Sequence, residues 1–113
     1  MRMITAIVRP SRYEAVREAL TGLGVQGLTV TEVKGFGRQR GRTEFYRGAE
    51  YEIIETPKLR IDVVVPVSLA EAATDAVIAA ARSGKVGDGM VFTAPIYNAA
   101  RIRTGEENDE ALR

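Results

Sequence analysis

The chain has 113 residues, of which 45% are hydrophobic, and its formal net charge is +1. This length predicts one small globular domain spanning residues 1–113, and the small charge lacks the basic excess of a general nucleic-acid-binding protein, so we expect no nucleic-acid partner. The sequence contains neither cysteine nor histidine, which excludes disulfides, thiolate nucleophiles, imidazole bases and the usual zinc sites.

The first half of the chain predicts a strand, a helix and a second strand. Residues 4–8 favour a strand, and Ser11 and Glu14 then have the spacing of a helix capping box. Gly22 offers a stop for this helix, and a second strand follows from about Gln26. Because no apolar run at the N-terminus is long enough for a signal peptide or membrane span, we expect a cytoplasmic protein without direct membrane insertion.

The second half repeats the pattern. Residues 59–65 favour a strand, Ser68 and Glu71 repeat the capping box, Gly84 is expected to close the helix, and a last strand covers about 90–97. The helix between them carries a narrow stripe of small apolar residues at helical spacing: Leu69, Ala72, Ala73, Ala76, Val77 and Ala80.

Two β-helix-β units predict an α+β fold of the ferredoxin-like split βαβ type (βαββαβ), a four-stranded antiparallel sheet with both helices on one face. The consecutive valines at 63–65 and the apolar run over residues 3–8 put apolar side chains on both faces of these strands. The face without helices should therefore pack against other copies of the chain. A monomer whose apolar face is shielded by a long loop is the alternative.

A long basic segment separates the second and third strands. Gly35, Gly37, Gly41 and Gly48 are expected to interrupt regular structure there and to expose backbone N–H groups. Five cations accompany them: Lys34, Arg38, Arg40, Arg42 and Arg47. Because loops of this length in small domains are usually functional or disordered, the segment favours an anionic partner, with a solvated flexible hairpin as the alternative.

Two further clusters could bind phosphate. Residues 84–89 combine three glycines with a lysine, which suits a phosphate-binding nest, although the P-loop pattern is absent. In residues 101–106, Arg101 and Arg103 would project from one side of an extended segment and could bind phosphates bidentately. Taken alone, each cluster could equally be ordinary surface.

Together and in this order, four segments resemble the motifs of the PII nitrogen-regulatory signal proteins: 29–39, 46–51, 85–89 and 101–106. The resemblance covers essentially the whole chain. It implies a homotrimer in which clefts between subunits bind ATP or ADP competitively. It also implies three named loops: a T-loop at about 37–55, a nucleotide-binding B-loop at about 82–90 and a C-terminal loop at about 101–113.

The resemblance also implies roles for single residues. Gln39 would bind Mg²⁺, and Lys58 would pair with a carboxylate of 2-oxoglutarate, whose keto acid end would share that metal with the ATP phosphates. Tyr51 matches the family tyrosine that receives a uridylyl or adenylyl group, or it is a plain contact residue. The nucleotide would be held by a larger set: Ile7, Thr29, Gly35, Gly37, Arg38, Gln39, Asp62, Val64, Gly87, Asp88, Gly89, Arg101 and Arg103.

Three departures from the family pattern bear on binding. Met90 stands where the family usually has a lysine, Asp62 replaces the more usual glutamate, and the loop exit at residues 52–56 differs from the usual pattern. Nucleotide preference and partner could differ accordingly.

The resemblance therefore implies a regulatory protein, not an enzyme, which controls targets such as an ammonium transporter or nitrogen-assimilation regulators through the T-loop. The lack of catalytic groups agrees with this interpretation. The alternatives are a divergent adenylate sensor that regulates a non-nitrogen transporter or enzyme, a slow ATPase or phosphotransferase, and a module for single-stranded RNA. The last needs exposed aromatic side chains on the sheet, and aromatic residues are only 6% of the chain.

Overall fold

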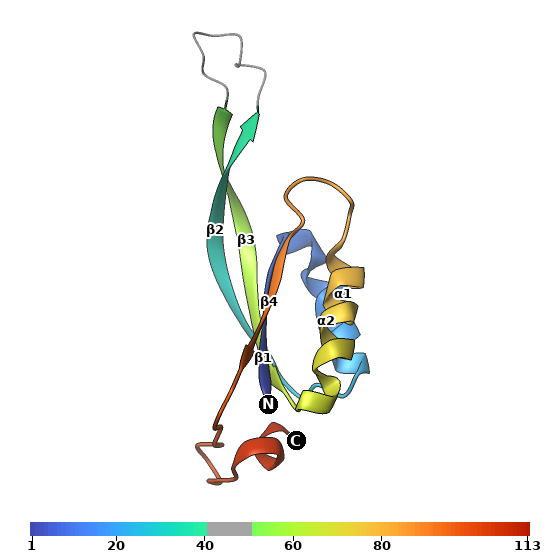
Figure 1. Cartoon of the computed structure of the whole chain (residues 1–113), viewed down its shortest axis with the longest axis vertical. Helices are drawn as coiled ribbons and strands as arrows, with labels where there is room; N and C mark the ends of the chain where they lie inside the picture. The colour runs from blue at the N-terminus through green and yellow to red at the C-terminus, as the bar shows by residue number, and fades with distance from the viewer. Residues whose placement is uncertain (41–50) are drawn as a thin grey trace.

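The computed structural model of the chain describes residues 1–40 and 51–113 (Figure 1). In chain order its elements are β1 (Arg2–Val8), the 3₁₀ turn η1 (Pro10–Arg12), α1 (Tyr13–Gly22), β2 (Thr29–Arg40), β3 (Tyr51–Val65), α2 (Val67–Ala81), β4 (Gly89–Pro95) and the 3₁₀ helix η3 (Asn108–Leu112). The strands form one antiparallel sheet in the order β2-β3-β1-β4. Both helices lie on the same side of it, which confirms the predicted split βαβ fold.

The core lies between the sheet and the two helices. Alternate residues of β1 and β3 point toward the helices, as the period of two requires, and α1 and α2 supply the opposite wall. The buried apolar side chains are Ile4, Ala6, Val8, Val16, Leu20, Ile61, Val63, Val65, Ala73, Val77 and Ala81. The two helices thus cover only one face of the sheet.

Both predicted capping boxes are wrong. Before α1, Pro10 begins a 3₁₀ turn in which the Arg12 N–H donates to the Arg9 carbonyl at 2.9 Å, so the chain is already helical at Ser11. Before α2, Pro66 is the N-cap residue and Ser68 lies inside the first turn. Neither helix has a side-chain hydrogen bond at its N-cap. Proline favours this position because its fixed φ and missing N–H suit a helix start.

The predicted stripe of α2 is confirmed in part. Ala73 and Val77 are buried and Leu69 and Ala80 pack against the core, whereas Ala72 is exposed and Ala81, which was not predicted, is buried. Ala81 also ends the helix, so Gly84 lies in the following loop at φ +85° and does not close the helix as expected. The stripe follows i, i+4 and i+8 because the helix crosses the sheet with this face toward β1.

The hairpin of β2 and β3 extends well beyond the helices (Figure 1). Gly35 and Gly37 were expected to interrupt regular structure, but both lie within β2, paired with Thr56 and Ile54 of β3. Of the T-loop expected at about 37–55, residues 37–40 and 51–55 therefore belong to paired strands, and residues 41–50 lie outside the described residues. The hairpin raises the radius of gyration to 17.3 Å, against about 13 Å for a compact domain of about 100 residues.

The face of the sheet opposite the helices is uncovered in the single chain. Met90 and Phe92 of β4 are exposed there by 64% and 51%, and Met3, Ile7 and Val64 continue the apolar surface across β1 and β3. In the part of the chain that the structure describes, no helix is long and apolar enough to span a membrane.

Candidate functional site

The B-loop joins α2 to β4 at the end of the sheet where β1 finishes (Figure 1). Gly87 and Gly89 take positive φ angles of +98° and +104°. A Cβ atom on Gly89 would lie 1.7 Å from the Ile7 carbonyl oxygen, so only glycine fits where β4 begins against β1. Ile7 and Gly89, both predicted site residues, are thereby placed side by side, and Gly87, a third, lies in the same loop beside Arg9 and Lys58.

Asp88 organises the B-loop from within. Its carboxylate accepts hydrogen bonds from the N–H groups of Ser83 and Gly84, each at 2.8 Å, and from the Ser83 hydroxyl. It also pairs with the Arg9 guanidinium at 3.3 Å. The hydrogen bonds from Ser83, together with those from Gly84 and Arg9, hold the pKa of Asp88 well below its ordinary value. The side chain predicted to bind the nucleotide therefore binds its own loop.

Two cations bind carbonyl oxygens of the B-loop. Nη2 of Arg9 donates to the Val86 carbonyl at 2.7 Å, and Nζ of Lys58 donates to the Gly87 carbonyl. Sequence reasoning missed Arg9, because its partner Asp88 lies 79 residues away and only the pairing of β1 with β4 brings them together. The sequence did predict Lys58 as a site residue. In the structure Lys58 lies beside Gly35, because a Cβ atom added to Gly35 would lie 3.4 Å from the Lys58 Cγ.

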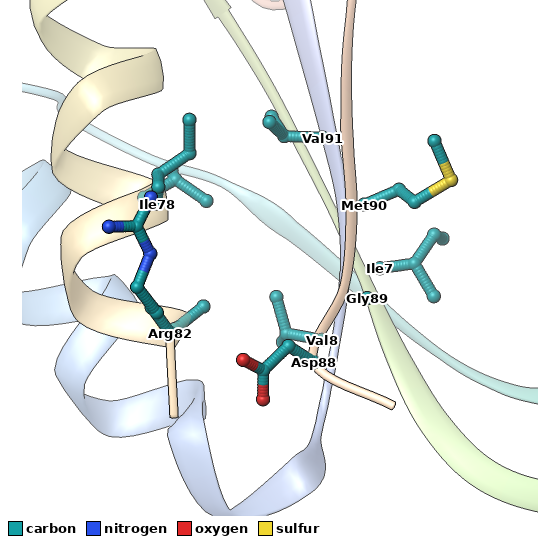
Figure 2. A pocket seen from close by; sticks show the side chains of 10 residues that line it. Ile7, Val8, Ile78, Arg82, Asp88, Gly89, Met90 and Val91 are labelled. Carbon is teal, nitrogen blue, oxygen red and sulfur yellow. The ribbon is translucent and has the colours of Figure 1, made fainter. Parts of the chain in front are cut away.

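A cavity of about 180 Å³ lies beneath the B-loop, between α2 and β4 (Figure 2). Val8, Ile78 and Val91 form its apolar walls, and Arg82 and Asp88 stand at its edge. In the same view, the side chains of Ile7 and Met90 point to the other side of the sheet, away from α2. These two side chains therefore form the start of the uncovered apolar face next to Gly89.

A second group of predicted site residues lies at the opposite end of the sheet. Thr29, Asp62, Val64 and Arg101 line one cavity of about 600 Å³, here called the lower cavity, which the C-terminal residues 111–113 also line. The pairing of Thr29 with Asp62 across β2 and β3 places these two on one face. The ends of β1 and β3, the connection before β2 and the C-terminal loop together make this cavity.

Within this cavity, Asp62 is held by two neighbours. Its carboxylate accepts a hydrogen bond from Thr5 Oγ1 at 2.6 Å and from Arg60 Nε at 3.0 Å. Partial burial raises the pKa of Asp62, but the hydrogen bond from Thr5 and the pair with Arg60 outweigh it and leave the pKa below its ordinary value. The group therefore stays ionised at neutral pH and offers an acceptor to a ligand hydroxyl.

The prediction of an extended segment around Arg101 is wrong. The Gly105 N–H donates to the Arg101 carbonyl at 2.7 Å, so the chain turns here instead of extending. The Arg101 guanidinium pairs with Glu106 at 2.7 Å and donates to the carbonyls of Ala111, at 2.9 Å, and Arg113. Arg103 is exposed on the turn, so the two arginines do not form the predicted row.

The single chain does not bring all the predicted residues together. Lys58, beside the B-loop, and Val64, in the lower cavity, are six positions apart along β3, about 20 Å at strand spacing. The backbones of Gly37, Arg38 and Gln39 lie in β2 and that of Tyr51 begins β3, but the side chains of Arg38, Gln39 and Tyr51 lie outside what the structure describes. Among the described residues, no group of three acidic side chains could hold a metal ion.

Comparison with known families matches residues 1–106 to the family described as "Nitrogen regulatory protein P-II". A protein of that name from Rhizobium etli is 52% identical over 112 residues, which cover 99% of this chain and all of that protein. Nitrogen regulatory protein P-II 1 of Escherichia coli strain K12 is 50% identical over the same proportions.

Solved structures give the same result for the fold. The structure of B. subtilis GlnK has a TM-score of 0.83 and 35% sequence identity, covering 98% of this chain and 97% of its own. The B. subtilis GlnK-ATP complex has a TM-score of 0.83 at 31% identity, with 98% and 96% coverage. The likeness therefore extends over nearly the whole chain.

Proposed function

The chain belongs to the P-II family of nitrogen regulatory proteins, and from this premise we propose that it binds ATP and ADP competitively in clefts between the subunits of a homotrimer. It is a regulatory protein and not an enzyme, as the names of its relatives indicate, which confirms the sequence prediction. A nucleotide complex of a relative, B. subtilis GlnK with ATP, supports the choice of ligand.

The separation of the two residue groups is the observation that carries this proposal. The B-loop supplies N–H groups for phosphates at one end of the sheet, whereas Arg101 and Arg103 belong to the C-terminal loop at the other end. A complete site needs both groups, and a neighbouring copy packed on the uncovered apolar face can supply the missing one. Arg101 would then exchange its contacts with Glu106 and the C-terminal carbonyls for phosphate oxygens.

The residues divide between the two sides of such a cleft. Ile7, Gly35, Gly37, Arg38 and the B-loop glycines would come from one protomer, and Thr29, Asp62, Val64, Arg101 and Arg103 from its neighbour. Ile7 would contact the base, and Asp62 would accept a hydrogen bond from a sugar hydroxyl. Phosphates would meet the backbone N–H groups of the B-loop and the two arginines.

We further propose that 2-oxoglutarate binds together with Mg²⁺-ATP. Gln39 would be a ligand of the metal, and Lys58 would pair with a carboxylate of 2-oxoglutarate. Mg²⁺, when bound, would link the phosphates to the keto acid through oxygen ligands. A site with few protein carboxylates suits this role, because Mg²⁺ bound through phosphates needs only one or two protein ligands. Lys58 would then leave the Gly87 carbonyl for the distal carboxylate.

The regulatory output is proposed to pass through the T-loop to target proteins in the cytoplasm, such as an ammonium transporter or nitrogen-assimilation regulators. Each ligand would shift the population of loop conformations by its difference in affinity between them. Tyr51 is the proposed position of nucleotidyl modification.

Titration calorimetry tests nucleotide binding. We expect one ATP or ADP per chain, with each displacing the other. Arg103→Ala removes a charge-assisted contact and should weaken the binding free energy of ATP by roughly 1.5–3 kcal/mol. Arg12→Gln, which removes an equal charge on η1, should leave the affinity unchanged. Equal affinities for wild type and Arg103→Ala would remove Arg103 from the site.

A separate titration tests the binding of 2-oxoglutarate. Binding should require Mg²⁺-ATP and should be lost in Gln39→Ala and Lys58→Ala, while ADP binding persists in both. If 2-oxoglutarate binds equally well without nucleotide, the shared-metal arrangement is wrong, and a divergent adenylate sensor becomes the better description.

A further inference from the structure

The B-loop turns two of its carbonyl oxygens toward cations. Arg9 Nη2 binds the Val86 carbonyl at 2.7 Å, and Lys58 Nζ binds the Gly87 carbonyl. A carbonyl oxygen facing a phosphate would repel it, so the direction of these two peptide groups matters to any anion bound by the loop. Reversing them would place oxygen atoms where N–H donors are needed.

Two N–H groups at this point of the loop remain available. Among the described residues, the N–H groups of Val86 and Gly87 donate none of the hydrogen bonds found, and the Gly87 N–H belongs to the same peptide as the Val86 carbonyl. Consecutive N–H groups beside a glycine at positive φ form the kind of concave donor set that binds anions. The loop thus has the carbonyls of Val86 and Gly87 bound to cations, whereas the N–H groups of the same two residues are available to a ligand.

Arg9 is better placed than Lys58 to maintain this arrangement. It follows Val8, which pairs with Gly89, and precedes Pro10, so its backbone is fixed at the end of β1. Its guanidinium binds both the Val86 carbonyl and the Asp88 carboxylate, two groups on either side of Gly87. A Cβ on Gly87 would lie 3.3 Å from Arg9 Nη2, so guanidinium and loop backbone are in close contact.

We propose that Arg9 is a positioning residue for the B-loop: by binding the Val86 carbonyl and Asp88, it fixes the loop in the conformation that presents its free N–H groups to phosphate. This inference rests on the proposed nucleotide site, and assigns Arg9 a role through the loop. Because Asp88 also binds the N–H groups of Ser83 and Gly84, loss of Arg9 should loosen the whole turn.

Limited trypsin digestion of the free protein tests the loop directly. Cleavage after Lys85, followed by mass spectrometry, should be about tenfold faster in Arg9→Gln than in wild type, because cleavage requires local opening. Arg12→Gln removes the same charge nearby, has no side-chain hydrogen bond among the described residues, and should cleave at the wild-type rate. Arg9→Lys keeps one cationic donor and should lie between the two.

Titration calorimetry with ATP then tests whether the loop contact of Arg9 affects nucleotide affinity. Arg9→Gln should bind about tenfold more weakly with unchanged stoichiometry, and Arg9→Lys should recover part of the loss. Weaker ATP binding without faster cleavage would mean that Arg9 contacts the nucleotide directly, and would overturn the inference. Faster cleavage with unchanged affinity would overturn it as well. Absence of nucleotide binding in the wild type would instead refute the proposed function, while an unchanged cleavage rate in Arg9→Gln would independently refute the role of Arg9 in the loop.

Discussion

At the residue scale, this protein depends on a few positions whose neighbours are far away in the sequence. Gly89 fits only because it lacks a Cβ facing the Ile7 carbonyl, and Asp62 stays ionised because Thr5 and Arg60 hold it. The sequence identified Gly89 and Asp62 as candidates through the family motif. It gave no sign of Thr5 or Arg9, because their contacts form only when strands β1, β3 and β4 pair.

Gly89→Ala should be strongly destabilising. The added Cβ would meet the Ile7 carbonyl oxygen at 1.7 Å with φ at +104°, so strain and overpacking together should cost at least roughly 3 kcal/mol. Gly84→Ala has a similar φ of +85° but open space around the new atom, and should cost about 1–2 kcal/mol. Urea unfolding at one protein concentration measures both, and equal losses would show that the close approach is not maintained in solution.

Thr5→Val should show how Asp62 responds to pH. The change removes the 2.6 Å hydrogen bond and should lower the free energy of unfolding at pH 7 by about 1 kcal/mol. Since the pKa of Asp62 is lower in the folded state, its contribution is present above the unfolded pKa and is lost as pH falls through the folded value.

The difference between wild type and Thr5→Val should therefore shrink when urea unfolding is repeated below about pH 4, near the pKa of an unfolded Asp. Thr93→Val on β4, whose hydroxyl makes no hydrogen bond among the described residues, should show no such change. A difference that stays constant or grows on acidification would contradict the assigned role of the Thr5 hydroxyl.

At the element scale, periodicity predicted which segments are helices and strands but not how each helix is rotated. In α2 most positions are apolar and most of these are alanine or valine, so more than one stripe fits the helical period. Contact with β1 and α1 selects the one through Ala73 and Val77. Prolines at the start of each helix also decided where it begins, which made the serine-based capping boxes unnecessary.

A pair of neighbouring substitutions tests this rotation. Ala73→Leu adds three carbons where the side chain is fully buried and should cost about 1–3 kcal/mol. Ala72→Leu adds the same atoms on an exposed position and should change stability by no more than about 0.5 kcal/mol. Thermal unfolding of the two variants would contradict the structure if Ala72→Leu were the more destabilising.

At the scale of the whole molecule, the uncovered face of the sheet is the feature that a single chain leaves unexplained. Met90 and Phe92 are exposed there beside Ile7 and Val64, and a surface of this kind marks an interface. The proposed trimer would bury this face and join the B-loop of one protomer to the lower cavity of the next.

Phe92→Glu should disrupt such an assembly, because it would bury a carboxylate in an apolar interface. Light scattering with size exclusion at micromolar concentration should give three times the chain mass of 12.3 kDa for wild type and a smaller mass for the variant. Val67→Glu is a matched control, since Val67 is 57% exposed at the start of α2 and away from the open face. A monomeric wild type would remove the cleft between subunits.

The sequence by itself determined the order of elements, the two-layer fold and, through the motifs, the family. These depend on local sequence patterns that extend over a few residues, such as side-chain period, β-branched runs and glycine positions. Only the tertiary structure decided the rotation of α2, the helix starts, the turn at Arg101 and the contact of Arg9 with Asp88. Each of these depends on which strands become neighbours, and a sheet of order β2-β3-β1-β4 joins residues as distant as Arg9 and Asp88, while it keeps Lys58 and Arg101 at opposite ends.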